Sequence, residues 1–188
     1  WSLTAMSIEP GRIRIPRGAT LDPGGIGKGL AADLLVADAL ARGASGVLVE
    51  VGGDLAAGGE PPDGHAWSIA VEDPLRPQAE LGVLTLTGGG VATSSRRRLR
   101  WRQGGREVTH IIDPRTGDSS VSDVAAATVV AATGAWAEAV ATSALVWGST
   151  SSSPRCPGSG RPRSWSGTTG CCFPWGWMRP RERSTSVE

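Results

Sequence analysis

The segment from Thr109 to Gly117, with the sequence THIIDPRTG, combines the residue types that phosphate chemistry uses. It contains one of the two histidines of the chain, followed by a carboxylate, a guanidinium and a hydroxyl. The run Val108–Ile112 predicts a strand, which Asp113-Pro114 ends because proline lacks the N–H that a β-ladder needs. We expect the strand to deliver His110 and Asp113 to a turn in which the Thr116 hydroxyl and the Gly117 N–H face a ligand. A hairpin end with a structurally hydrogen-bonded histidine is the alternative.

Residues 21–29, LDPGGIGKG, form a glycine-rich segment at the start of a predicted helix. The free N–H groups of such a segment and the helix dipole favour an anion such as phosphate. Lys28 would stand beside that anion, and it is the single lysine of a chain with eighteen arginines. The segment matches neither standard nucleotide-binding fingerprint, because Gly29 occupies the position where Ser or Thr would bind magnesium. A tight structural turn is the alternative.

Glu138 and Thr142 are four residues apart in the second predicted helix, so they lie on one face of it. A carboxylate and a hydroxyl are ligands that a hard cation such as Mg²⁺ accepts, together with substrate phosphates and water. The same spacing is also common on solvated helix surfaces. Taken alone, the pair therefore leaves a metal site and a plain surface open.

The composition limits the class of protein. With 188 residues the chain suits one domain that buries a real core. Its net charge of +1 argues against a general nucleic-acid binder, and the arginine-rich run 96–102 is more typical of a solvated hairpin. No apolar run approaches the roughly 18 to 20 residues of a membrane span. We therefore expect no nucleic acid as a partner and no membrane span in this chain.

Strands and two helices follow one another irregularly, which predicts an α+β fold with mixed or antiparallel sheets and flanking helices. The first helix begins near Gly27 and has Gly43 as its C-cap, and the second covers residues 135–147. The apolar stripes of the two helices consist of Leu30, Leu34, Ala37 and Ala41 in the first and of Trp136, Val140, Ala144 and Trp147 in the second. Strands are expected at residues 12–15, 47–51, 67–71, 83–87, 91–95, 99–102, 106–113 and 124–132.

Residues 149–188 differ in kind from residues 1–148. Serine, proline, arginine, glycine, cysteine and tryptophan mix there without a helical or strand period, and all three cysteines of the chain lie in this part. We expect a domain over residues 1–148 and a tail over residues 149–188 that is disordered or non-native. A shifted reading frame that replaced the native ending is the preferred explanation of the tail.

Taken in order, these segments resemble the ApbE family, the FAD:protein FMN transferases. The matching segments are residues 21–29 with 31–33, 51–54, 90–94, 110–117 and 137–142. The resemblance implies an ApbE-like α+β domain that is partial, because the family has a preceding region that this chain lacks. It also implies Mg²⁺-dependent transfer of FMN from FAD to a threonine hydroxyl of an acceptor protein, with release of AMP.

The resemblance further implies the roles of individual residues. FAD would contact a set of seven residues, namely Lys28, Asp54, Thr93, Ser94, His110, Ile112 and Thr116. His110 would also be the base for the attacking hydroxyl. The Gly25 carbonyl, Glu138 and Thr142 would hold Mg²⁺, which neutralises charge on the pyrophosphate.

Glu138 departs from the family pattern, in which aspartate is typical at this position. The extra methylene moves the carboxylate by about 1.5 Å, which is a large shift for a cation that demands near-ideal octahedral geometry. This change, together with truncation, leaves a non-catalytic FAD-binding fragment as one alternative. The others are an FAD pyrophosphatase, in which water replaces the protein hydroxyl and FMN and AMP are produced, and a chain that without the missing segments has no stable domain. The sequence shows no location signal, and the resemblance implies the cell envelope, outside the cytoplasm or on a lipoprotein anchor.

Overall fold

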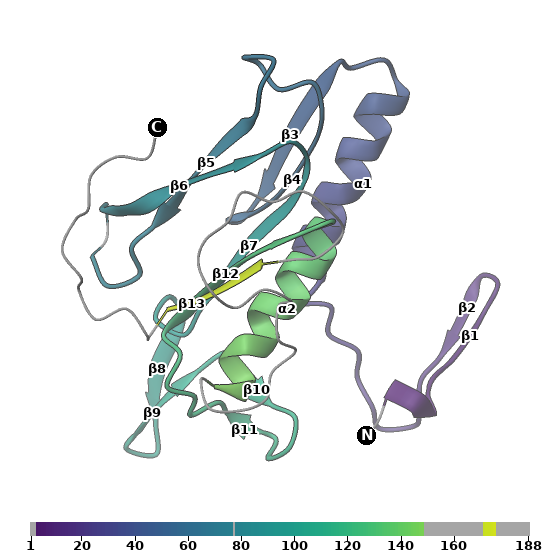
Figure 1. Cartoon of the computed structure of the whole chain (residues 1–188). Coiled ribbons are helices and arrows are strands. Elements are labelled where there is room, and N and C mark those ends of the chain that lie inside the picture. Colours follow the sequence, from purple (N-terminus) through teal and green to yellow (C-terminus); the bar gives the residue numbers. More distant parts are fainter. Residues whose placement is uncertain (1–2, 77, 149–170, 176–188) are drawn as a thin grey trace.

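The computed structural model describes residues 3–76, 78–148 and 171–175. At its centre is a five-stranded antiparallel sheet in the order β13-β12-β7-β4-β3. These strands are β3 (Gly46–Val51), β4 (Asp54–Gly59), β7 (Gly89–Ser95), β12 (Ala126–Ala131) and β13 (Cys171–Trp175). Two helices, α1 (Gly27–Ala41) and α2 (Gly134–Trp147), lie along one face of the sheet (Figure 1).

The two faces of the sheet bury different side chains, because successive residues of a strand point to opposite sides. Ala56 of β4 packs with Ala32 and Val36 of α1. Its neighbour Leu55 faces the other way and packs with Trp67 of the hairpin β5 (Trp67–Glu72) and β6 (Glu80–Leu86). The sheet is therefore the middle layer, with the helices on one side and this hairpin on the other.

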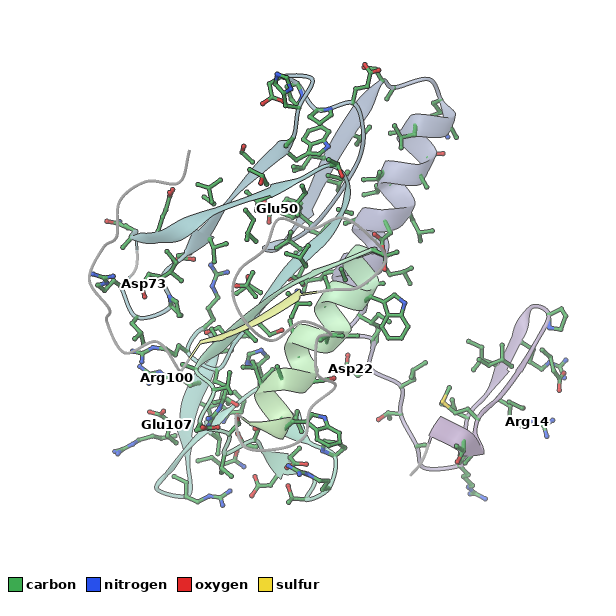
Figure 2. All side chains as sticks on the ribbon, viewed as in Figure 1. Arg14, Asp22, Glu50, Asp73, Arg100 and Glu107 are labelled. Carbon is green, nitrogen blue, oxygen red and sulfur yellow. The ribbon has the colours of Figure 1, made fainter. Side chains whose placement is uncertain are left out.

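Three smaller hairpins complete the described structure. They are β1 (Ser7–Glu9) with β2 (Arg12–Arg14), β8 (Arg100–Gln103) with β9 (Arg106–Thr109), and β10 (Ile112–Asp113) with β11 (Asp118–Ser119). A short 3₁₀ helix, η1 (Leu3–Ala5), precedes β1. Arg100 and Glu107 form an ion pair across the β8–β9 hairpin at 3.4 Å (Figure 2). The α+β class with antiparallel sheets and flanking helices is confirmed.

Helix α1 begins at Gly27 as predicted, but it buries a different face. Gly29, Ala32 and Val36 are its buried residues, whereas Leu30 and Leu34 of the predicted stripe are 45% and 62% exposed. Small residues face the sheet because α1 lies close to it. Gly43 follows the helix with a φ of 97°, the left-handed conformation of a glycine after a helix end.

Helix α2 repeats the same pattern. Its buried face consists of Gly134, Ala137, Glu138, Ala141 and Leu145, one or more positions away from the predicted stripe. Thr133 caps the helix, since its hydroxyl accepts a hydrogen bond from the N–H of Trp136. Trp136 itself is 65% exposed.

The prediction of a continuous strand over residues 106–113 was wrong. Strand β9 ends at Thr109, and β10 begins at Ile112 in a separate two-stranded sheet. Thr109 folds its hydroxyl onto the N–H of Ile111 at 3.3 Å, and its own N–H donates to Ser119 Oγ at 2.7 Å. These local hydrogen bonds compete with the ladder, so the chain turns at His110.

The prediction for the tail falls mostly outside the described residues. In residues 149–188 the structure describes only β13, which pairs with β12 from Ala126↔Trp175 to Val130↔Cys171. The sequence pattern predicts no element there. Neither of the helices in the described ranges is long and apolar enough to cross a membrane.

Candidate active site

The two helices meet at their N-terminal ends and exchange hydrogen bonds there. The carboxylate of Asp33, on α1, accepts from the N–H groups of Gly134 and Ala135 at 2.7 and 2.9 Å. In return, Glu138 Oε2, on α2, accepts from the N–H of Gly29 at 2.8 Å. Each helix therefore supplies a carboxylate to free N–H groups at the start of the other, where the helix dipole favours a negative charge.

Sequence reasoning assigned no separate role to Asp33. An aspartate inside a helix is a poor helix former, and this is the one signal that the sequence offers. Its partners Gly134 and Ala135 are more than a hundred positions away along the chain. A contact at that separation cannot be inferred from helical periodicity.

Lys28 lies at this junction, between two buried carboxylates. Its Nζ donates to Asp54 Oδ2 and stands 3.3 Å from Glu138 Oε1. The lysine side chain is 44% exposed, whereas each carboxylate side chain is 2% exposed. One ammonium thus serves two carboxylates and stays in contact with solvent.

A glycine turn and a neighbouring strand hold Asp54 in place. Gly52 and Gly53 have φ angles of 58° and 93°, which few other residues adopt, and they end β3 so that β4 starts at Asp54. The second carboxylate oxygen, Oδ1, accepts from the N–H of Thr93 in β7 at 3.2 Å. Asp54 is therefore anchored independently of Lys28.

The pKa values of Lys28 and Asp54 reflect this shared charge. Burial would lower the pKa of Lys28, but the hydrogen bond and charge of Asp54, helped by the charge of Glu138, raise it above its ordinary value. Burial raises the pKa of Asp54, and the nearby Glu138 carboxylate adds to the increase, although Lys28 opposes it. Two carboxylates thus share one ammonium in this cluster.

Gly25, Ser94 and Thr142 extend the same cluster. Thr142 Oγ1 and Ser94 Oγ are hydrogen bonded at 3.0 Å. A Cβ added to Gly25 would lie 3.6 Å from Thr142 Cγ2 and 3.9 Å from its Oγ1. The structure therefore brings the glycine loop of the predicted metal site beside one of its two predicted side-chain ligands.

The residues present are suited to Mg²⁺. Glu138 Oε1 is buried and has no hydrogen-bond partner among the described residues, although Lys28 Nζ stands at ion-pair distance. A free carboxylate oxygen, a hydroxyl and a loop carbonyl are the hard oxygen donors that Mg²⁺ takes. In the described ranges no three His, Cys, Asp or Glu side chains gather as a metal site. A cation bound here would therefore need the hydroxyl, the carbonyl, substrate oxygens or water as further ligands.

The glycine-rich segment offers fewer free N–H groups than predicted. The N–H of Gly27 donates to the Pro23 carbonyl at 2.7 Å, and that of Gly29 donates to Glu138. Asp22, on the connection from β2 to α1 (Figure 2), accepts from the N–H of Gly24 at 2.8 Å. The hydrogen bonds to Pro23 and Asp22 shape the loop, and the one to Glu138 ties it to α2, so the Lys28 ammonium is the charged group that could attract an anion here.

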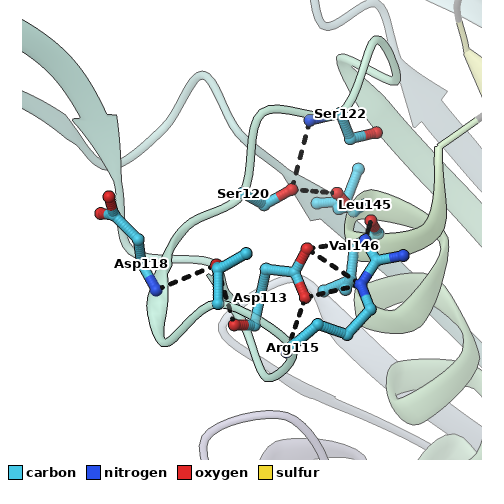
Figure 3. Close-up of polar contacts among 8 residues, drawn as sticks. Asp113, Arg115, Asp118, Ser120, Ser122, Leu145 and Val146 are labelled. Carbon is cyan, nitrogen blue, oxygen red and sulfur yellow. Dashed lines mark hydrogen bonds and ion pairs between the residues drawn. The ribbon is translucent and has the colours of Figure 1, made fainter.

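The polar side chains of the segment Thr109–Gly117 mainly bind one another and the end of α2 (Figure 3). The Arg115 guanidinium binds both carboxylate oxygens of Asp113, with Nε at 2.9 Å from Oδ1 and Nη2 at 2.6 Å from Oδ2, and also donates to the carbonyl of Val146 at 3.3 Å. Ser120 Oγ donates to the Leu145 carbonyl at 2.7 Å. Both contacts satisfy carbonyls of the last turn of α2, which have no partner inside the helix.

Thr116 belongs to the same turn. Its hydroxyl donates to the Asp113 carbonyl at 3.4 Å and accepts from the N–H of Asp118 at 3.2 Å. The structure thus gives the side chains of Asp113 and Thr116 hydrogen-bond partners in and beside the turn. The proposed contact of Thr116 with FAD stays a prediction.

His110 and Ile112 are exposed at the start of this turn. Ile112 is 53% exposed, and His110 Nδ1 lies 3.2 Å from the carbonyl oxygen of Leu99. A carbonyl only accepts hydrogen bonds, so Nδ1 carries the proton in this contact and Nε2 of the neutral ring is an acceptor. Among the contacts described, neither His110 nor Ile112 touches Lys28. That they act on the same ligand as Lys28 stays a prediction.

Thr93 presents its side chain to the opposite face of the sheet from Lys28. Its Oγ1 is hydrogen bonded to Thr128 Oγ1 at 2.8 Å. Both threonines line a pocket of about 440 Å³ between the sheet and the β5–β6 hairpin, with Arg97, Arg98 and Arg100 among its walls. Of the predicted FAD contacts, Thr93 therefore joins the Lys28 cluster through its backbone N–H alone.

Comparisons with known proteins give a consistent result. A model of the ApbE family matches residues 3–154. The FAD:protein FMN transferases of Klebsiella pneumoniae and Escherichia coli K12 are 33% and 34% identical over 124 residues, which is 65% of this chain and 35% of each relative. The chain thus spans about a third of the length of these curated relatives.

Solved structures agree with this match. The ApbE protein from Thermotoga maritima superposes with a TM-score of 0.67 and is 31% identical, over 76% of this chain and 47% of that one. The apo flavinyl transferase ApbE from Pseudomonas stutzeri has a TM-score of 0.64 and 33% identity, over 78% of this chain and 45% of that one. The described fold is therefore part of a larger known one.

Proposed function

This chain belongs to the ApbE family, and we propose that it carries part of the active site of an enzyme that transfers FMN from FAD to an acceptor protein. The observation that carries the proposal is the position of Lys28 between the buried carboxylates of Asp54 and Glu138. Thr142 lies on the same face of α2 as Glu138. A cation beside carboxylate and hydroxyl oxygens suits a reaction at a pyrophosphate, where positioning and charge stabilisation supply most of the rate.

In the proposed reaction the hydroxyl oxygen of an acceptor threonine attacks the phosphorus of the FMN half of FAD. The new oxygen–phosphorus bond forms as the bond to the bridging oxygen breaks, and the bonding electrons leave with AMP. The threonine proton passes to a base. Atoms and charge balance without a redox step.

His110 is the proposed base. Its Nδ1 proton is directed at the Leu99 carbonyl, so Nε2 is the nitrogen able to take the threonine proton. The ring is exposed at the surface, where the hydroxyl of another protein can reach it. This role requires the acceptor threonine to approach from the solvent side of β9.

Lys28 is proposed to bind a phosphate oxygen of FAD through its exposed ammonium. Glu138, Thr142 and the Gly25 carbonyl would hold Mg²⁺, which, when bound, neutralises charge that develops on the pyrophosphate. Asp54 keeps Lys28 oriented toward the cluster. FAD contacts by Ser94, Ile112 and Thr116 complete the proposed binding set.

Two alternative functions are each supported by a specific observation. An exposed His110 could equally activate water, which would make the chain an FAD pyrophosphatase. The hydrogen bond from Gly29 to Glu138 could instead fix the carboxylate in a structural role, which leaves an FAD-binding fragment without catalysis. The family also suggests action at the cell envelope, which fractionation of cells that produce the protein would test.

One experiment separates these functions. The chain is incubated with FAD, Mg²⁺ and an acceptor protein, the acceptor is weighed by mass spectrometry, and AMP is quantified. The transferase predicts an FMN adduct and an equal amount of AMP, whereas the pyrophosphatase predicts AMP and free FMN without an adduct. FAD binding without AMP supports the non-catalytic fragment, and Glu138→Asp should then restore AMP release.

A further inference from the structure

The contact between Lys28 and Glu138 bears on how a metal ion could reach the Glu138 carboxylate. Glu138 Oε2 is held by the N–H of Gly29 at 2.8 Å, but Oε1 has no hydrogen-bond partner among the described residues. The ion-pair contact of Oε1 is with Lys28 Nζ at 3.3 Å. The ammonium therefore occupies the approach to the one carboxylate oxygen that is free to bind a metal.

The Lys28 ammonium can move away from Glu138 Oε1. Its ammonium sits at the end of a flexible stem, and the side chain is 44% exposed. Asp54 and Glu138 are instead fixed from behind, by the N–H groups of Thr93 and Gly29. If a cation exchanges here, the carboxylates stay and the lysine moves.

We propose that Lys28 is a tethered competitor of the metal: it neutralises Glu138 while no dinucleotide is bound, and it must release Oε1 before Mg²⁺ binds. This inference rests on the proposed function, because it takes the cation and the FAD diphosphate from there. Two cations at one oxygen repel each other. A diphosphate that attracts Lys28 frees Glu138, so the dinucleotide and the metal bind cooperatively.

The first test measures the affinity for Mg²⁺ alone, by calorimetry and without FAD. Lys28→Met removes the charge and keeps the length of the side chain, so Mg²⁺ should bind roughly 5- to 150-fold more tightly than to the wild type. Lys28→Arg keeps a positive charge and should bind Mg²⁺ as weakly as the wild type. Glu138→Gln should lose the binding in either background.

The outcomes separate this inference from the proposed function. Equal or weaker Mg²⁺ binding by Lys28→Met overturns the competition and leaves metal-assisted transfer standing. If neither protein binds Mg²⁺ at millimolar concentrations, the competition is overturned and the metal is removed from the proposed function as well.

A second test uses the wild-type protein, in case Lys28→Met leaves Asp54 unpaired and does not fold. Lys28 is the only lysine of the chain, so lysine-selective ¹³C and ¹⁵N labelling gives a single side-chain NMR signal. Titration with Mg²⁺ should move that signal along the same binding curve as calorimetry, because the ammonium leaves Glu138. An unchanged signal at saturating Mg²⁺ would overturn the inference.

Discussion

Gly29 of α1 and Gly134 of α2 lie in direct backbone contact. A Cβ added to Gly29 would stand 2.2 Å from the carbonyl oxygen of Gly134, and one added to Gly90 of β7 would stand 2.2 Å from the nitrogen of Gly134. Three glycines thus allow two helices and a strand to touch without side chains between them. Lys28 and Glu138 meet because the junction is this tight.

Gly29→Ala should break the junction. Its methyl group meets backbone atoms, which cannot rotate away, so we expect a loss of about 3 kcal/mol in the free energy of unfolding. Gly27→Ala is the matched control, because its Cβ would meet Pro23 at an ordinary 3.5 Å. Alanine is a better helix former, so this control should keep or raise stability, by up to about 1 kcal/mol. Urea denaturation measures both, and equal stabilities would contradict the packing argument.

Asp33→Ala should weaken the contact of α1 with the start of α2. Two N–H groups would lose a charged acceptor, and we expect a loss of about 2 kcal/mol in the free energy of unfolding. Asp38→Ala on the same helix removes only an exposed ion pair with Arg42 and should cost about 0.5 kcal/mol or less. A capping role for Asp33 would be refuted by similar urea midpoints of the two variants.

The two helices of this fold could be predicted from the sequence, but their buried faces could not. Hydrophobic periodicity identified α1 and α2 within a residue or two, because helix formation is largely local. It also favoured the larger side chains, such as Leu34, as the buried face. The structure buries Gly29, Ala32 and Ala137, because close packing at the junction needs small residues.

The candidate site, too, could be predicted from the sequence only in part. The glycine loop and Lys28 could be selected from their types and spacing, whereas Glu138 and Thr142 were assigned to the site by the family resemblance. The burial of Glu138 could not be predicted, because its partner Gly29 is 109 positions away. The contact of Arg115 with the Val146 carbonyl could not be predicted either, since it depends on where α2 ends.

Arg115→Ala should lower stability at neutral pH and lose part of that effect in acid. The hydrogen bonds from the Arg115 side chain and N–H hold the pKa of Asp113 below its usual value. A carboxyl whose folded pKa lies below its unfolded value of about 3.9 stabilises the fold above pH 4, and this contribution disappears as the pH falls through the folded pKa. The difference in urea midpoint between wild type and variant should therefore be largest at neutral pH and shrink below pH 4, to the part that the contact with the Val146 carbonyl contributes.

Arg12→Ala is the control for this pH dependence. It removes the same charge from the exposed strand β2, and no hydrogen bond of its side chain ties it to the core among the contacts described. Its urea midpoint should follow the wild type at every pH. A constant difference between wild type and Arg115→Ala from pH 3 to 7 would show that the loss comes from contacts other than Asp113.

Two substitutions of Glu138 should separate its structural role from its role in binding Mg²⁺. Glu138→Asp shortens the side chain by a methylene and should lose the hydrogen bond to Gly29, at a cost of about 1 to 2 kcal/mol in unfolding free energy. Glu138→Gln keeps the length and an acceptor for that N–H, so it should remain closer to wild-type stability. Its Mg²⁺ binding should nevertheless be lost, because the free carboxylate charge is gone. A stable Glu138→Gln protein with unchanged Mg²⁺ affinity would argue against this residue as a ligand.

His110→Asn tests the proposed base. The substitution removes the imidazole that accepts the proton, so AMP release in the presence of acceptor should fall by about 10²- to 10⁴-fold. FAD binding should change less, because the six other predicted FAD contacts, Lys28 among them, are untouched. His65→Asn is the matched control: it alters the other histidine of the chain, in an exposed loop where Asp63 accepts the backbone N–H of His65 at 2.8 Å. Equal rates of AMP release by the two variants would exclude His110 as the base, whereas a loss confined to His110→Asn assigns the proton transfer to it.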